Sequence, residues 1–185
     1  LLGSFFNESL GSLAKMSWNG FEHNVLYQNE GEGVFVNVAW LLGVAHEYDS
    51  RTVLAEDLDA DGRPDLMVGQ VNWTKDMQEL PNFVNIIRNQ MPRGNNWVGV
   101  RLHEHGPGKS PAGAVIKVLY DGNSAMRHVV TGDSWRAQHS GQKHFGLGRA
   151  KGVEAIEVRW PNGKVSRLNK PAINRYHTVA PPKGE

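Results

Sequence analysis

The chain of 185 residues carries 20 Lys and Arg against 19 Asp and Glu, so its formal net charge is +1. This balance argues against nucleic acid or an anionic membrane as the main partner, and no apolar run reaches the ~20 residues that a membrane-spanning helix needs. The absence of cysteine excludes disulfides, thiolate metal sites and cysteine nucleophiles, while 21 glycines and 9 prolines are typical of a turn-rich β protein.

The first part of the chain predicts a hairpin. Residues 1–20 contain apolar side chains at helical spacing, which favours a short helix or an ordered arm. Residues 25–29 and 34–38 are rich in β-branched and aromatic side chains and flank a Glu-Gly-Glu-Gly turn, which is the pattern of two antiparallel strands. The sequence begins at Leu1 rather than Met, which is compatible with removal of an export signal or of further domains.

Two more strands are predicted at residues 50–55 and 65–69. With the hairpin they predict one four-stranded, propeller-blade-like antiparallel sheet. The first strand of the hairpin is faintly repeated, since residues 85–89 (NIIRN) resemble residues 25–29 (VLYQN). The repeat predicts the opening strand of a second four-stranded unit. Residues 74–81 are polar and end in proline, which favours an exposed loop.

The aspartate loop (residues 57–65, DLDADGRPD) has acidic residues at its first, third, fifth and ninth positions. Carboxylates this close repel one another unless a cation offsets their charge. Ca²⁺ takes six to eight oxygen ligands at about 2.3–2.6 Å, and alternate positions of a tight loop can turn their oxygens toward one centre. The loop therefore predicts a Ca²⁺ site with side-chain ligands Asp57, Asp59, Asp61 and Asp65 and the backbone carbonyl of Arg63.

Two other interpretations of the aspartate loop are less favoured. An EF-hand needs a bidentate Glu at the twelfth position between two helices, whereas this position is Val68 in a strand-like run. An ordinary Asp/Gly turn with solvated carboxylates needs no metal, but four alternating acids around Gly62 are uncommon by chance. Such a loop beside a strand predicts stabilisation of the fold before it predicts any chemistry.

The second half of the chain predicts a compact antiparallel sandwich or barrel. Pro, Gly and two Asn within residues 92–96 interrupt any regular element and mark a domain boundary. Asp121-Gly122 and Asn162-Gly163 predict hairpin turns, the second with the composition of a type I′ turn. The strands predicted downstream of the boundary are residues 97–102, 114–120, 126–130, 155–160 and 165–168.

At this point the sequence resembles two known families. The aspartate loop and its flanking strands look like the Ca²⁺ loop of FG-GAP/VCBS-type repeats. Residues from about 95 to 179 resemble an ASPIC/UnbV domain, and residues 17–24 are similar to the lead-in of bacterial members. The domain resemblance rests on four ordered blocks, which are residues 96–102 (NWVGVRL), 111–118 (PAGAVIKV), 144–148 (HFGLG) and 156–164 (IEVRWPNGK).

The same pairing occurs in the cartilage acidic protein family and in many exported bacterial proteins, where it is associated with binding and adhesion. The resemblance implies an extracytoplasmic, Ca²⁺-stabilised interaction or structural subunit and no established reaction. Two departures matter: the chain carries about one blade, too few to close a propeller ring, and residues 132–139 follow the family pattern only loosely.

Together these observations predict an all-β protein with a blade-like sheet packed with a sandwich or barrel-like domain. Residues 1–92 form the FG-GAP/VCBS-like blade with the Ca²⁺ loop, and residues 93–185 form the ASPIC/UnbV-like domain. One blade has exposed edges and a thin core, so we expect a protein partner or a larger complex to cover it. We expect a non-enzyme located outside the cytoplasm, as a periplasmic, cell-surface or secreted protein.

A carbohydrate-binding module is the first alternative. Trp135 stands beside Arg136 in a polar segment and is the best candidate for an exposed contact with a glycan. Trp97 and Trp160 lie in strand patterns, which favours positions in the core. Glycan binding lost on Trp135→Ala would favour this alternative.

A hydrolase or a metal-dependent accessory enzyme is the less favoured alternative. Asp133 and His139 with Ser134 or Ser140 have the residue types of a triad, but no nucleophile elbow surrounds either serine. His103 and His105 could share one face of a strand, yet no third metal ligand is close in sequence. His144 begins the strand-like HFGLG block and has no assigned role.

Overall fold

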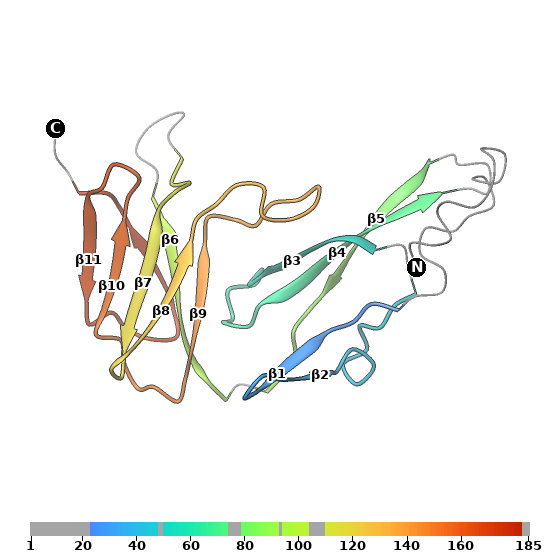
Figure 1. Ribbon diagram of the computed structural model, residues 1–185, viewed down its shortest axis with the longest axis horizontal. Coiled ribbons are helices and arrows are strands. Elements are labelled where there is room, and N and C mark those ends of the chain that lie inside the picture. The colour runs from blue at the N-terminus through green and yellow to red at the C-terminus, as the bar shows by residue number, and fades with distance from the viewer. Residues whose placement is uncertain (1–22, 48–49, 74–78, 93, 104–109, 183–185) are drawn as a thin grey trace. The chain divides into compact units, whose positions relative to one another are not determined.

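The structure, a computed structural model, shows an all-β chain, as predicted (Figure 1). No helix occurs within the described ranges, so none there is long and apolar enough to cross a membrane. The predicted helix or arm at residues 1–20 lies outside them. Of the loop predicted at residues 74–81, only residues 79–81 are described, and they belong to a strand. The described residues are 23–47, 50–73, 79–92, 94–103 and 110–182.

Twelve strands occur in these ranges and are joined mostly by short turns. They pair into four sheets, in the orders β1-β2, β3-β4-β5, β11-β10-β7-β8 and β12-β6-β9. The strands are β1 Tyr27–Gly31, β2 Val34–Asn37, β3 Ser50–Glu56, β4 Asp65–Trp73, β5 Glu79–Ile87, β6 Asn96–Leu102, β7 Val115–Tyr120, β8 Asn123–His128, β9 Lys143–Gly148, β10 Ala155–Arg159, β11 Val165–Asn169 and β12 Tyr176–Val179.

The chain divides into two compact units that interleave in sequence. The first contains the described residues up to Val53 together with Val68–Ile87, and the second contains Leu54–Met67 and Arg88–Glu185. The predicted division between residues 92 and 93 does not coincide with this boundary, because the aspartate loop makes its contacts within the second unit. The division into two sequence domains itself stays a prediction.

In the first unit, the prediction of one four-stranded blade is wrong in its strand pairing. Among the described strands, β1 and β2 pair only with each other, with Tyr27 opposite Asn37. After β2 the chain turns back on itself, since Leu42 N donates to Val38 O at 3.0 Å and Val44 N to Ala39 O at 2.9 Å. β3, β4 and β5 form a separate sheet.

The internal repeat also has a different outcome. Residues 85–87 end β5, which pairs beside β4, so the repeated segment closes this sheet and does not open a second one.

The second unit is a sandwich of two sheets around one core. Residues from β7 and β10 on one sheet and from β6 and β9 on the other alternate between the core and the outside, the period of two expected of strands. The largest fully buried side chains are Phe145, Ile116, Ile156, Val98, Val100, Val118 and Val158. Trp160 is also buried, as predicted, and its indole N–H donates to Ser166 Oγ at 2.9 Å.

One strand pair departs from the predicted antiparallel arrangement. β12, which the sequence patterns did not indicate, pairs parallel to β6, with Tyr176 opposite Gly99 and Val179 opposite Leu102. β6 pairs antiparallel with β9 on its other side. β6 is therefore the central strand of its sheet, and it carries Trp97 between β12 and β9.

The two predicted hairpin turns are present, but the type I′ turn predicted at Asn162-Gly163 occurs instead at Asp121-Gly122. Asp121 and Gly122 both have positive φ, 46° and 70°, which is the type I′ pattern. At the second turn only Gly163 has positive φ, 82°, and its N–H donates to Trp160 O at 2.9 Å. Pro161 suits the second position of a type I turn, and Gly163 then supplies the left-handed residue that returns the chain to the strand.

Candidate metal centre

The aspartate loop connects β3 to β4, two neighbouring strands of one sheet. Asp57, Asp59 and Asp61 each offer a carboxylate oxygen, and the three oxygens lie within 4.8 Å of one another. Two ligands on opposite sides of a Ca²⁺ ion are about 4.6–5.2 Å apart, twice the usual Ca–O distance. The three carboxylates are therefore close enough to share one cation, and their donor set consists of oxygen alone.

Backbone amides hold these carboxylates in place. Asp57 Oδ1 accepts from Asp61 N at 3.0 Å, and Asp57 Oδ2 accepts from Gly62 N at 2.9 Å. Asp59 Oδ1 also accepts from Asp61 N, at 3.2 Å, and Asp61 Oδ1 accepts from Arg63 N at 3.0 Å. Short acidic side chains bonded to the backbone of their own loop form Asx turns, and here they tie successive residues into one tight bend.

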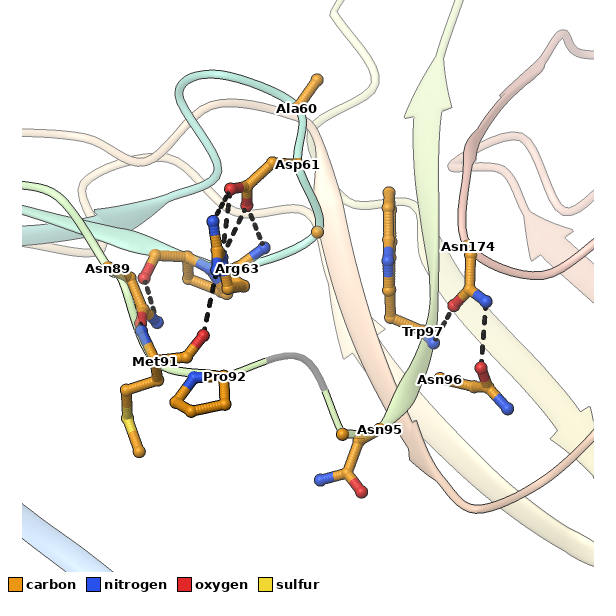
Figure 2. A pocket seen from close by; sticks show the side chains of 13 residues that line it. Ala60, Asp61, Arg63, Asn89, Met91, Pro92, Asn95, Asn96, Trp97 and Asn174 are labelled. Atoms are coloured by element: carbon orange, nitrogen blue, oxygen red, sulfur yellow. Dashed lines mark hydrogen bonds and ion pairs between the residues drawn. The ribbon is translucent and has the colours of Figure 1, made fainter.

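Two arginines offset part of the negative charge of the loop. The guanidinium of Arg63 bonds both carboxylate oxygens of Asp61, and its Nη1 donates to Met91 O at 2.9 Å (Figure 2). Arg88 Nη2 lies 2.6 Å from Asp59 Oδ2. The hydrogen bond to Asp61 is the main reason why the pKa of Arg63 is raised. Part of the repulsion is therefore offset by the protein itself, and the metal ion stays a prediction.

Asp65 takes a different position from the other three acids. It is 3% exposed, Oδ1 accepts from Asn89 N at 2.7 Å, and Oδ2 accepts from Leu58 N at 3.2 Å. These bonds join the end of the loop to its beginning and to the segment that follows β5. Asp65 is not one of the three clustered carboxylates, so its role as a ligand stays a prediction, as does that of the Arg63 carbonyl.

Three aromatic residues fasten the aspartate loop to the sandwich, and the sequence did not predict their role. These fastening residues are Trp97, His144 and Tyr176. The hydroxyl of Tyr176 donates to Asp57 Oδ2 at 2.6 Å, and His144 Nε2 lies 3.0 Å from Gly62 O. Trp97 stacks on His144, with ring centroids 5.2 Å apart, and lies 5.0 Å from the Tyr176 ring. β6, β9 and β12 thus each supply one ring to the surface that contacts the loop.

Gly62 is the point of closest approach between the loop and this surface. Its φ is +90°, and a Cβ at this position would lie 2.0 Å from Trp97 Nε1. Position 62 therefore needs glycine for two reasons, the left-handed backbone and the indole beside it. The sequence indicated the sharp turn, but not the tryptophan.

The protonation of the fastening residues is consistent with their contacts. Burial raises the pKa of the Tyr176 hydroxyl, and the hydrogen bond to Asp57 raises it further, so Tyr176 keeps its proton and donates. Burial lowers the pKa of His144. A neutral His144 with its proton on Nε2 donates to the carbonyl of Gly62, because that oxygen can only accept.

A cavity of about 710 Å³ opens beside the aspartate loop (Figure 2). Asp61, Arg63 and Asn89 lie toward the loop, and Trp97 and Asn174 lie toward the sandwich. Most of these polar groups are already used, since Asn89 Nδ2 donates to Pro64 O at 3.1 Å and Asn174 Oδ1 accepts from Trp97 N at 3.0 Å. Of the three clustered carboxylates only Asp61 lines this cavity, and it is paired there with Arg63.

The residues of the imagined triad are only partly brought together. His139 Nδ1 lies 3.3 Å from Asp133 Oδ1, as a triad requires. The other ring nitrogen, Nε2, accepts a hydrogen bond from Ala55 N at 3.2 Å, where a triad would need a serine. Ser140 Oγ instead donates to Glu56 Oε2 at 3.0 Å. These contacts use the groups that hydrolysis would need, and the expectation of a non-enzyme stays a prediction.

The remaining candidate residues are separate from the metal cluster. Trp135 is 53% exposed, and the guanidinium carbon of Arg136 lies 4.4 Å from its ring centroid. The arginine therefore covers one face of the indole, and a role in glycan binding stays a prediction. His103 N donates to Val179 O at 2.9 Å, while His105 lies outside the described residues.

Comparison with known sequence families gives a match within the second half of the chain. No curated protein matches the sequence. The FG-GAP/VCBS-type repeat predicted for the first half therefore stays a prediction. The block at residues 96–102 lies in β6 and ends just before the family match, which begins at residue 105. Residues 105–185 match the sequence family described as ASPIC and UnbV, as the resemblance implied.

Proposed function

We propose that this chain is an exported, Ca²⁺-stabilised interaction or structural subunit of a larger assembly. The observation that carries the proposal is the convergence of Asp57, Asp59 and Asp61 on one point of a tight loop. A set of carboxylate oxygens within 4.8 Å of one another suits a hard cation, and Ca²⁺ is favoured because it accepts the flexible, carboxylate-rich geometry of a protein loop more readily than Mg²⁺.

A cation in the loop would act on the sandwich as well as on the loop. Asp57 would be shared between the cation and Tyr176, and the fastening residues would hold the loop in the shape that the cation needs. Outer partners of this kind orient metal ligands. A weak site of the extracellular type would be filled at the roughly millimolar Ca²⁺ found outside cells, which supports an extracytoplasmic location.

The apolar surface of the first unit supports the interaction part of the proposal. Every residue of β1 and β2 is exposed, and a two-stranded hairpin is at best marginally stable alone in water. Exposed apolar residues gather on and after this hairpin, and such groups mark interaction sites. They are Tyr27, Val34, Phe35, Val36, Trp40 and Leu41.

Calcium is expected to raise the melting temperature of the metal-free protein, and Asp59→Asn is expected to abolish most of this shift. A ligand that binds only the folded state stabilises it by about 2.7 kcal/mol at a hundred times its Kd. Asp59 is suited to the test because its ion pair with Arg88 is exposed and such pairs contribute at most about 1 kcal/mol.

Asp121→Asn removes one carboxylate from a hairpin turn of the second unit and serves as the matched control. Terbium luminescence excited through tryptophan gives a second measurement, because Trp97 is the indole beside Gly62. The expected signal is lost in Asp59→Asn and competed away by Ca²⁺. A native protein that melts identically with and without Ca²⁺, after removal of bound metal is verified, would contradict the metal site.

Leu41→Asp is expected to release the partner from the complex purified from the native source. Leu41 is 83% exposed after β2, so the substitution places a charge on the apolar surface without disturbing the core of the second unit. Native mass spectrometry reports whether the partner remains bound. Val165→Asp is the control, since Val165 is also exposed but lies on β11 of the sandwich. Equal loss in both variants, or retention in Leu41→Asp, would argue against this surface.

A further inference from the structure

A second cavity, of about 410 Å³, lies within the second unit and shares Asp57 with the acidic cluster. Its walls come from the end of β3 and the aspartate loop, from β8, β9 and the segment that joins these two strands, and from β12. It is lined largely by charged and polar side chains, which favours a hydrophilic occupant over an apolar one. Its charged members are Glu56, Asp57, Asp133, Arg127 and Lys143. Asp57 is already bonded to the loop and to Tyr176.

The acidic side chains of this cavity are held by donors of the protein. Glu56 accepts from Ser140 N at 2.6 Å and from Ser140 Oγ at 3.0 Å. Asp133 accepts from His139 N at 2.9 Å, and this bond is the main reason why the pKa of Asp133 is lowered. The Asp133 carboxylate therefore stays ionised, and both carboxylates are held in fixed positions. Each still has lone pairs left to accept further hydrogen bonds, since a carboxylate has about four acceptor sites.

The two basic side chains are not neutralised in this way. Arg127 donates only to the adjacent carbonyl of Met126, at 3.1 Å, and lies 5.7 Å from the ring centroid of Phe145. Lys143 Nζ donates to Ser140 O at 3.2 Å. Neither cation has a carboxylate within ion-pair distance in the described part of the chain. Both can therefore offer a charged donor to a molecule in the cavity.

The distribution of charge along the chain points to the same kind of occupant. The second unit, residues 54–67 and 88–185, contains seventeen Lys and Arg against eleven Asp and Glu, a net charge of +6, while residues 1–53 and 68–87 contain three against eight, a net charge of −5. The near-neutral total hides this asymmetry. Arg127 and Lys143 thus belong to a strongly basic part of the chain, whose field raises the local concentration of anions.

We propose that the second cavity binds a small polyhydroxylated carboxylate, of the chemical class of the sugar acids. The ligand carboxylate pairs with Arg127 and Lys143, and the ligand hydroxyls donate to the free lone pairs of Glu56 and Asp133. This arrangement gives a role to both signs of charge in one cavity. A neutral sugar leaves the two cations unpaired, and a simple carboxylate leaves the acidic wall unused.

Titration calorimetry of the full chain with D-glucuronate tests the proposal. Saturable binding is expected at physiological salt, and Arg127→Gln and Lys143→Gln are each expected to weaken it about tenfold or more, the usual effect of losing a charge-assisted hydrogen bond. Lys117→Gln is the matched control, because Lys117 is an exposed cation of β7 in the same unit that does not line the cavity. It should leave the affinity unchanged.

Three comparison ligands separate the sources of binding. Glucose has the same ring without the carboxylate, acetate has the carboxylate without the ring, and glucose 6-phosphate carries another oxyanion. Glucose and acetate are expected to bind at least about tenfold more weakly than glucuronate. Absence of saturable glucuronate binding would overturn the proposal. Equal weakening by Lys117→Gln would also overturn it, since general charge and not the cavity would then explain the affinity. Tighter binding of the phosphate would reject the carboxylate in favour of another anion. Because Asp57 belongs to both sites, the titrations are made with and without Ca²⁺, and glucuronate binding that is the same in both separates the cavity from the metal centre.

Discussion

Gly62→Ala is expected to destabilise the second unit by about 2–4 kcal/mol, the combined effect of backbone strain and overpacking. The φ of +90° is unfavourable for alanine, and the new Cβ would overlap the indole of Trp97 at 2.0 Å. The indole has little room to move, because it packs against His144 and Tyr176. Unfolding in denaturant, followed by tryptophan fluorescence and circular dichroism, measures the loss.

Gly163→Ala separates the two effects. Gly163 has a similar φ of +82° in a turn of the same unit, but nothing lies within 4 Å of an added Cβ. This variant should lose only the strain, about 1 kcal/mol. Equal losses in the two variants would mean that the contact between Gly62 and Trp97 does not hold the loop to the sandwich.

The sequence predicted most of the sandwich because its signals are local. Alternating apolar residues predicted β6, β7, β10 and β11, and Asp121-Gly122 predicted the turn into β8. It failed where pairing depends on residues far apart. β12 has four residues, half-exposed for the most part, and its place beside β6 follows from contacts some eighty residues apart, which no local pattern can indicate.

The candidate site shows the same division. The spacing of the aspartates predicted the cluster of Asp57, Asp59 and Asp61, since alternation within one loop is a local property. The fastening residues could not be predicted in the same way. Tyr176 and Asp57 are separated by 119 residues, and His144 and Gly62 by 82. Only the folded sheet brings them together. From the sequence alone, an aromatic residue in a strand pattern is predicted simply to lie in the core.

Asp57→Ala is expected to destabilise the metal-free second unit by about 3–5 kcal/mol, because it leaves several buried or half-buried donors without an acceptor. Asp57 is 7% exposed and accepts from Asp61 N, from Gly62 N and from the hydroxyl of Tyr176. Asp59→Ala is the comparison. Asp59 is exposed and accepts one backbone bond, so without metal its loss should cost no more than about 1 kcal/mol.

A double-mutant cycle isolates the bond that joins the loop to β12. Tyr176→Phe removes only the hydroxyl, and Asp57→Asn removes the charge of its partner. Asp57→Asn also replaces one acceptor oxygen with an NH₂ donor, and the cycle subtracts this cost because it is present with and without the Tyr176 hydroxyl. If the 2.6 Å hydrogen bond couples the two residues, their effects on the free energy of unfolding should be non-additive by about 1.5–3 kcal/mol, the usual range for a bond to a charged group. Additivity within about 0.3 kcal/mol would show that the two side chains are neighbours without energetic coupling. In that case the loop would be held by Trp97 and His144, and Gly62→Ala would still be destabilising while Tyr176→Phe would not.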